Sequence, residues 1–188
     1  MKSIAIVGES GGLAKELILK LQNSYQVRSF GKDQYNYVNS NDVDALAKEI
    51  AKFDIIINCP GVFDTDSWDT FLINCVAPAK LIEQLVTHNS RSHVILIGSH
   101  AATWTSWPNI NLKRLWYNIS KETLESIVLG VNHSGATNLK FTLFNVSRFQ
   151  TAMGNFSGNK VEEVVSIIED IIVSTNPPLI YELPSPDA

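Results

Sequence analysis

Tyr117 and Lys121 lie four residues apart in a stretch with helical periodicity, a spacing that stacks a phenol and an ammonium on one helix face. A tyrosine keeps its proton up to pH ~10, so a nearby positive charge is needed before its oxygen can act as a base near neutrality. Lys121 is able to supply that charge. The pair therefore indicates proton-transfer chemistry, although an exposed helix pair without any chemical role has the same spacing.

Two further polar residues stand where such a pair could use them. Ser99 directly follows an apolar strand predicted over residues 93–98, so its hydroxyl could donate to a carbonyl oxygen at the carboxyl end of a sheet. A cap or turn serine is the alternative. Asn74 precedes Pro78 by four residues, and Pro78 has no N–H to donate to the Asn74 carbonyl oxygen. That oxygen is then free to hold a water, or the helix simply kinks, and the two interpretations carry equal weight.

A glycine-rich segment, Val7-Gly8-Glu9-Ser10-Gly11-Gly12-Leu13-Ala14, joins the first predicted strand to its helix. Glycines at such a turn let the backbone approach a pyrophosphate, whose charge is met by unpaired amides at the helix N-terminus. Gly8 fits one spacing with Gly12 and another with Gly11, and both place the phosphates at the same point. A tight turn that binds no ligand is the remaining alternative.

The elements that must position these residues alternate along the chain. Apolar and β-branched runs predict strands over residues 4–7, 25–30, 53–58, 93–98, 139–145 and 179–182, and residues 35–38 are compatible with another short strand. Helical periodicity predicts helices over 13–21, 43–51, 67–88, 112–131 and 160–173, the second capped by Asn41 or Asp42. This alternation indicates an α/β fold with a doubly wound, mainly parallel sheet covered by helices on both faces, in three layers.

Composition narrows the function classes. A chain of 188 residues with 45% apolar residues predicts one domain over 1–188. The net charge of −4, without basic runs, predicts no nucleic-acid partner, and the sequence predicts no membrane span and no signal peptide, hence a cytoplasmic protein. Cys59 and Cys75 lack metal-ligand or redox spacing and are expected to be buried thiols. His100 and His133 have no partners at ligand spacing, so no metal is expected.

The combined motifs resemble the short-chain dehydrogenase/reductase family from residue 1 to about residue 182. The glycine-rich segment resembles the family's T-G-x-x-x-G-x-G loop, with Val7 for threonine and Ala14 for the last glycine. Asn58-Cys59-Pro60-Gly61 stands where the family has N-N-A-G, and Thr151-Ala152-Met153 resembles its T-x-M segment. The order of its catalytic tetrad is matched by Asn74, Ser99, Tyr117 and Lys121.

The resemblance implies a Rossmann-type domain in which Tyr117 is the general acid/base for hydride transfer between a nicotinamide and a carbonyl compound or alcohol. Ser99 would hydrogen-bond the substrate oxygen, and Asn74 would hold a water in the proton relay. Lys121 would bind the nicotinamide ribose and lower the tyrosine pKa. The residues implied for cofactor binding are Gly8, Ser10, Gly11, Gly12, Leu13, Lys32, Asn58, Pro60, Gly61, Tyr117, Lys121 and Thr151.

Departures from the family pattern leave an alternative open. Ser147-Arg148 replaces the usual Pro-Gly, and the chain between Met153 and the last predicted helix has no room for substrate-covering helices, so the site is expected to be open. The tryptophans in this region, Trp104, Trp107 and Trp116, suit a substrate wall and a core cover equally well. A non-catalytic dinucleotide-binding redox sensor or scaffold is therefore the alternative function. The complete tetrad argues against it.

The end of the second strand predicts NADP rather than NAD. Dinucleotide folds that select NAD place an acidic residue there, and the alignment puts Gly31 at that position with Lys32 next. No carboxylate is then expected to repel a 2′-phosphate, and Lys32 would attract it, helped by Arg28 if the strand end is shifted. Lys32 and Asp33 are equally compatible with solvated turn charges, and a shift by two would make Asp33 the NAD-selecting carboxylate.

The predicted helices 67–88 and 112–131 are long and apolar on more than one side. In the resembled family the equivalent helices pair across a two-fold axis, which implies a homo-oligomer, a dimer or tetramer.

Overall fold

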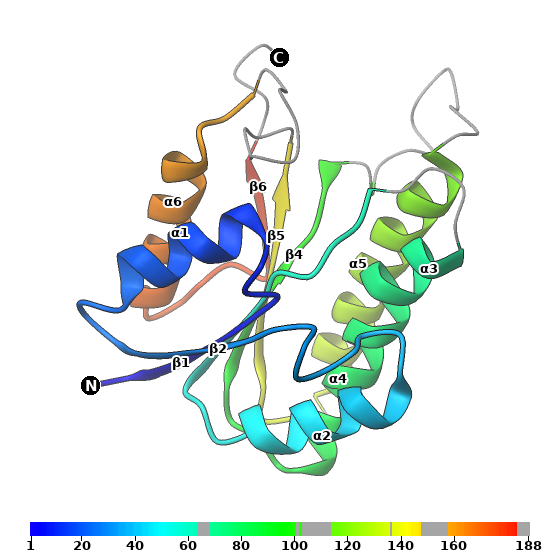
Figure 1. Cartoon of the computed structure of the whole chain (residues 1–188), viewed down its shortest axis with the longest axis horizontal. Coiled ribbons are helices and arrows are strands. Elements are labelled where there is room, and N and C mark those ends of the chain that lie inside the picture. Colours follow the sequence, from blue (N-terminus) through cyan, green and yellow to red (C-terminus); the bar gives the residue numbers. More distant parts are fainter. Residues whose placement is uncertain (64–67, 101, 103–113, 136, 148–157, 184–188) are drawn as a thin grey trace.

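A computed structural model describes residues 1–63, 68–100, 102, 114–135, 137–147 and 158–183. The predictions for Trp104, Trp107, Arg148 and Thr151 fall outside the described residues. Within these residues a six-stranded sheet runs in the order β2-β1-β3-β4-β5-β6, and each neighbouring pair is parallel (Figure 1). The strands are β1 (Ser3–Val7), β2 (Gln26–Phe30), β3 (Ile55–Asn58), β4 (His93–Ile97), β5 (Lys140–Val146) and β6 (Ile180–Leu183).

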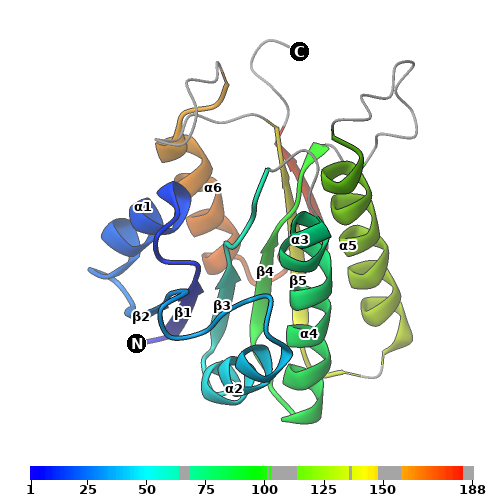
Figure 2. The ribbon, with the colours of Figure 1, turned by 45° about the vertical axis from the view of Figure 1, so that its right-hand side comes forward.

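The helices cover the two faces of the sheet unequally (Figure 2). They are α1 (Gly12–Leu21), α2 (Ser40–Ile50), α3 (Trp68–Phe71), α4 (Ala77–Thr87), α5 (Leu115–Ser134) and α6 (Val161–Val173), and a π-helical segment, Leu72–Val76, joins α3 to α4. One core packs α1 and α6 against Ile4 and Ile6, and the other packs α2, α4 and α5 against Ala5 and Val7. Because β1 is buried on both faces, its sequence is apolar at consecutive positions. The predicted doubly wound, three-layer α/β fold is thereby confirmed.

Two local predictions are wrong. Residues 35–38 form no strand, because Tyr37 turns inward and its hydroxyl donates to the side-chain oxygen of Asn58 at the end of β3. The amides of Gln34 and Tyr35 both bond to the Gly31 carbonyl, which closes this segment as a turn. The second helix begins earlier than expected, with Asn39 as its cap: the Asn39 side chain accepts a hydrogen bond from the Asn41 amide at 3.0 Å.

The strand order places the candidate site. The chain leaves β1 toward β2 on one side and then returns to β3 on the other side, so β1 and β3 flank the point where the winding reverses. Ligands of such Rossmann-type sheets bind at this reversal, beyond the carboxyl ends of the strands. The glycine-rich loop after β1 and the turn after β3 meet there. Among the described residues no helix is long and apolar enough to cross a membrane.

Candidate active site

The glycine-rich loop lies directly against the turn after β3. Gly8 has φ +86°, and a Cβ added to it would lie 2.9 Å from the backbone nitrogen of Pro60, so a larger residue cannot occupy this position without displacing the turn after β3. The Gly8 amide donates to the Phe30 carbonyl at 2.8 Å, and the Cys59 amide donates to the Val7 carbonyl at 3.1 Å. These bonds bring the carboxyl ends of β1, β2 and β3 together at one loop.

The N-terminus of α1 opens onto this loop. Gly11 is its N-cap and supplies no side-chain hydrogen bond, so the first-turn amides keep their capacity to bind an anion. The Leu13 side chain is 6% exposed and belongs to the core, which leaves only its backbone for a ligand. Ser10 is exposed beside the loop. A tight glycine turn that ends in an uncapped helix is the arrangement that a dinucleotide pyrophosphate requires, so these residues fit such a ligand.

The turn after β3 connects the loop to the polar residues predicted for catalysis. Pro60 packs against Gly8. Asn58 is buried, and its side-chain oxygen accepts a hydrogen bond from the Tyr37 hydroxyl. A Cβ added to Gly61 would lie 3.7 Å from Asn74 Oδ1 and 4.0 Å from Lys121 Nζ. Gly61 therefore lies within van der Waals reach of these two polar groups.

Asn74 lies in the π-helical segment, whose cause is visible in the sequence. Pro78 cannot donate a helical hydrogen bond, and the preceding amide, of Ala77, bonds to the Leu72 carbonyl five residues back instead of four. Oδ1 of Asn74 accepts from the Val62 amide at 2.9 Å, and its Nδ2 donates to the Val62 carbonyl at 2.8 Å. The side chain therefore fixes the segment that follows the turn after β3.

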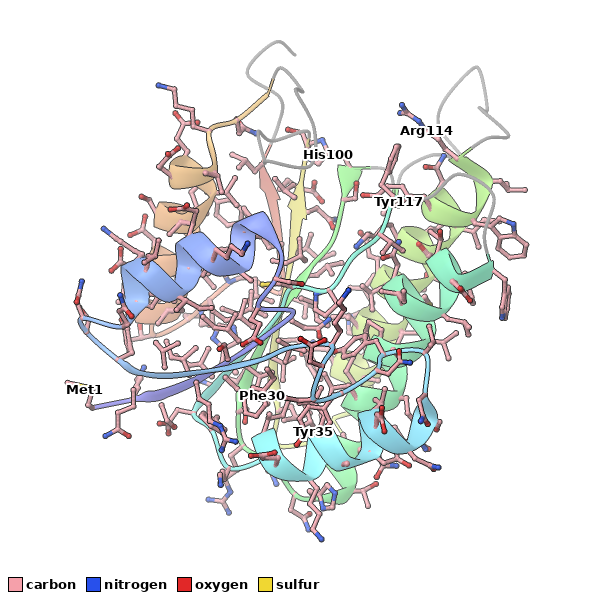
Figure 3. The ribbon with its side chains drawn as sticks, viewed as in Figure 1. Met1, Phe30, Tyr35, His100, Arg114 and Tyr117 are labelled. Carbon is pink, nitrogen blue, oxygen red and sulfur yellow. The ribbon has the colours of Figure 1, made fainter. Side chains whose placement is uncertain are left out.

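Tyr117 lies in the first turn of α5, with its hydroxyl hydrogen-bonded to the side chain of Ser99. Burial raises the pKa of the Tyr117 phenol, and the Ser99 hydrogen bond and the Arg114 guanidinium oppose that rise without cancelling it. Figure 3 shows Tyr117 and Arg114 close together near the carboxyl edge of the sheet. The positive charge that lowers the pKa of Tyr117 is therefore that of Arg114, a residue that the sequence did not indicate.

Lys121 is buried, with its ammonium 5.8 Å from the centroid of the Tyr117 ring. Its Nζ donates to the Ile97 carbonyl at 2.9 Å, which ties α5 to the end of β4. Burial lowers the pKa of Lys121 to about 8, and nearby Cys75 partly opposes this change. The structure thus brings the four residues of the predicted tetrad into one cluster, with Asn74 and Lys121 below Gly61 and Ser99 bonded to Tyr117.

Asn145 on β5 is a positioning residue that sequence reasoning missed. Its Oδ1 accepts from the Ser99 amide at 3.1 Å, and its Nδ2 donates to Glu125 and Glu182, both at 2.8 Å. Gly98 permits this contact, because an added Cβ would collide with the Asn145 side-chain amide. Only the pairing of β4 with β5 brings these residues together, so no local sequence signal identifies Asn145.

The end of β2 corrects the prediction that no carboxylate lies near Gly31. The strand ends at Phe30, so Gly31 is the next residue as expected, whereas Asp33 lies in an exposed turn. However, a Cβ added to Gly31 would lie 2.9 Å from the carboxyl carbon of Glu9. Glu9 belongs to the glycine-rich loop, a whole helix and strand earlier in the sequence, so the local alignment could not reveal it. Lys32 is exposed beside this carboxylate-covered position.

Aromatic rings flank the cluster on the α3 and α5 side. The Phe63 ring meets the Tyr117 ring edge-on at 4.8 Å between centroids, and the Arg114 guanidinium lies 4.9 Å from the Phe63 centroid. Trp116 packs edge-on against Trp68 of α3, with 5.2 Å between the ring centroids. Of Trp104, Trp107 and Trp116, the structure describes Trp116 alone, and this side chain covers α3. Phe63 was not identified from the sequence.

Histidines and cysteines take no part in a described metal cluster. His100 Nε2 lies 3.1 Å from Glu182 Oε2, and His133 is exposed in the last turn of α5. Burial raises the pKa of Cys59 to about 12 and that of Cys75 to about 11, so both thiols stay protonated near neutrality. Across the described residues no group of three or more His, Cys, Asp or Glu side chains could hold a metal ion.

No family model and no curated protein matches the sequence. Solved structures share the fold. A short chain dehydrogenase from Burkholderia cenocepacia in complex with NADP has a TM-score of 0.80 at 11% identity, covering 98% of this chain and 88% of that one. The dTDP-4-dehydrorhamnose reductase from Bacillus anthracis in complex with NADP has a TM-score of 0.74 at 18% identity, and the match covers 97% of this chain and 74% of that one. A 4-hydroxyisoleucine dehydrogenase complexed with NADH and succinate has a TM-score of 0.77 at 16% identity, and the match covers 97% of each chain. The chain therefore has the fold of short-chain dehydrogenases/reductases.

Proposed function

We propose that this chain is an NADP(H)-dependent oxidoreductase of the short-chain dehydrogenase/reductase type that interconverts a carbonyl compound and its alcohol. The observation that carries the proposal is the Tyr117 hydroxyl bonded to Ser99, with the Lys121 ammonium 5.8 Å from the Tyr117 ring centroid. The similar structures that were solved with NADP or NADPH support the choice of nucleotide.

The dinucleotide supplies or accepts the hydride when it is bound, and the protein handles the proton. In the reductive direction the Tyr117 hydroxyl donates its proton to the carbonyl oxygen, and in the oxidative direction the phenolate accepts the proton of the alcohol. Ser99 donates a hydrogen bond to the same oxygen, and the Asn145 side chain positions Ser99 through its backbone amide. Because the Tyr117 and Ser99 side chains already contact each other, one oxygen can reach both.

Lys121 and the loops supply the remaining groups. With a pKa of about 8, Lys121 is mostly protonated near pH 7, so its ammonium favours the Tyr117 phenolate and can bond the hydroxyls of the nicotinamide ribose. The amides of Gly12 and Leu13 would bind the pyrophosphate, with Gly8 and Pro60 below it, whereas the Gly11 amide already donates to the Gly8 carbonyl at 3.0 Å. In this proposal Asn74 keeps the segment after β3 in place and holds the relay water at its backbone.

The test is a screen of aldehydes, ketones and quinones with NADPH, followed by the absorbance of the reduced nicotinamide, and a direct titration of NADPH binding. Turnover by the wild type and none by Tyr117→Phe supports the proposal. Turnover that survives in Tyr117→Phe shows that another group moves the proton. NADPH binding without turnover of any class favours the second candidate.

The second candidate is a non-catalytic dinucleotide-binding sensor or scaffold. Two observations favour it: burial raises the pKa of Tyr117, and the Asn74 amide group is bonded to the Val62 backbone through both of its atoms. Both features suit a fixed binding domain without proton transfer. The complete set of Asn74, Ser99, Tyr117 and Lys121 in one cluster makes the enzyme the better supported of the two.

A further inference from the structure

The carboxylate of Glu9 occupies the place where Rossmann-type folds read the ribose of the adenosine half. That place lies between the glycine-rich loop and the end of β2, where a carboxylate selects the 2′ and 3′ hydroxyls and a cation accommodates a 2′-phosphate. Gly31 stands at the position that carries the acidic side chain in NAD-selecting folds, and Glu9 fills the space that a side chain there would take. The glycine-rich loop thereby places a carboxylate, that of Glu9, beside the end of β2, where the strand's own sequence has Gly31.

Glu9 is held in this position by the strand that it covers. Ser29 Oγ donates to Glu9 Oε2 at 2.6 Å, and the Glu9 amide lies 3.4 Å from the Phe30 carbonyl. Oε1 is the carboxylate oxygen that lies toward Gly31. One oxygen is therefore used to orient the group, and the other lies against Gly31, at the end of β2.

Two cations near the end of β2 bear on the same choice. Arg28 bonds to Glu49, with Nη2 and Oε1 2.5 Å apart, and its guanidinium lies 4.9 Å from the centroid of the Phe30 ring. Arg28 is thus engaged on the side of α2, whereas Lys32 is exposed directly after Gly31. Lys32 and Glu9 act in opposite directions on a 2′-phosphate, by attraction and by repulsion.

We propose that Glu9 is a specificity-determining residue that weakens the binding of the 2′-phosphate of NADP(H) and binds the ribose hydroxyls of NAD(H), so that the proposed preference for NADP(H) is reduced and NAD(H) is bound as well. This inference rests on the proposed function, because it concerns the same dinucleotide site. The ratio of NADP(H) to NAD(H) affinity then depends on two residues, Glu9 and Lys32, that can be substituted separately.

The experiment measures binding alone, by direct titration of NADP⁺, NAD⁺, adenosine 2′,5′-bisphosphate and AMP. Glu9→Gln keeps the shape and the Ser29 hydrogen bond but removes the charge. We expect it to tighten both 2′-phosphate ligands by roughly tenfold, because the repulsion is removed, and to weaken NAD⁺ and AMP, because their ribose hydroxyls lose a charged acceptor. The gain should shrink between about 0.05 M and about 0.5 M salt, because screening weakens a charge effect and leaves a shape effect intact.

Two further variants sharpen the result. Ser29→Ala releases the carboxylate and should give a smaller gain in the same direction, whereas Glu16→Gln, the same change on the body of α1, should give none. Equal tightening of all four ligands would show that Glu9 acts as a steric plug, and no change would show that it only ties the loop to β2; either result overturns the proposal. If neither dinucleotide binds the wild type or Glu9→Gln, the proposed function falls together with this inference. Selective binding without turnover contradicts only the proposed enzyme.

Discussion

At the scale of single residues, Tyr117 is the group on which the proposed reaction depends. Tyr117→Phe removes the hydroxyl that bonds to Ser99 and keeps the ring that packs against Phe63. We expect turnover to fall by at least roughly 100-fold, with NADPH affinity nearly unchanged, because the phenol moves the proton and contributes little to nucleotide binding. Kinetic assays with separate binding titrations measure both effects. The control Tyr25→Phe lies at the opposite end of β2 and should behave as the wild type.

Lys121 gives a prediction for stability as well as for function. Its pKa is about 8 in the folded chain, against 10.5 for an ordinary lysine. Between these values the unfolded chain binds more protons, so folding stability rises with pH across that window and carries a penalty below it. The penalty corresponds to about 3 kcal/mol. Lys121→Met should therefore raise the free energy of unfolding near neutral pH by about 1–3 kcal/mol and remove the alkaline rise.

The same variant should lose turnover and bind NADPH more weakly, because the ammonium is proposed to contact both the ribose and the Tyr117 oxygen. Urea unfolding at about pH 7 and about pH 9.5, with a nucleotide titration, tests both parts. Lys15→Met, an exposed change on α1, is the control. A less stable Lys121→Met with full activity would contradict the assigned environment and the assigned role together.

At the scale of elements, the sequence predicted what depends on periodicity and missed what depends on distant pairing. Six predicted strands, from 4–7 to 179–182, have counterparts in the sheet, whereas residues 35–38 have none. The inner strands such as β1 and β3 are recognisable because strands buried on both faces are uniformly apolar. The π-helical turn at Asn74 follows from Pro78, yet local pattern reading could only mark the missing N–H. Glu9 over Gly31 and Asn145 under Ser99 are contacts between elements, so neither could be read from neighbouring residues.

His93 predicts how the β4, β5 and β6 side of the sheet responds to acid. The Thr142 hydroxyl donates to the Pro178 carbonyl at 2.8 Å, so it must accept from His93 Nε2, 2.9 Å away, and His93 is neutral with its proton on Nε2. Burial, helped by Lys140 and Lys2, lowers the pKa of His93 to about 4 from an ordinary 6.5.

As the pH falls from 6.5 toward 4, the unfolded chain takes up the proton first, so stability should be lost across that window. The loss between these two pKa values amounts to about 3 kcal/mol. His93→Gln keeps an Nε2 donor without titrating and should flatten this part of the stability curve. Chemical unfolding from about pH 7 to about pH 4 measures the slope. An unchanged slope in His93→Gln, or the same flattening in His133→Gln, would contradict the assignment.

At the scale of the whole molecule, the topology gathers the chemistry at one edge. All described strands are parallel, so the loop after β1, the turn after β3 and Ser99 after β4 emerge on the same side, although they are far apart in sequence. The opposite edge and both helical faces are left for packing and assembly. This separation lets an assembly prediction be tested independently of the site.

We expect the chain to form a homo-oligomer through the side that carries α3 and α5, which lie together in Figure 2. Trp68 on α3 is 52% exposed and Val76 in the π-helical segment is 40% exposed, so burial against a second copy would remove apolar surface from water. A two-fold interface contains each of these side chains from both subunits, so a single substitution changes the interface at two places.

Val76→Lys should therefore shift the sedimentation pattern at micromolar concentration toward the 20.8 kDa species. Leu19→Lys makes a matched change at a residue that is 58% exposed on α1, which covers the other face of the sheet, and it should leave assembly unaltered. A wild type that sediments only at 20.8 kDa refutes the oligomer, and an oligomer dissolved by Leu19→Lys but not by Val76→Lys moves the interface to α1. Because Val76 points away from the core while its neighbour Cys75 is buried, the substitution should change assembly with little loss of folding stability.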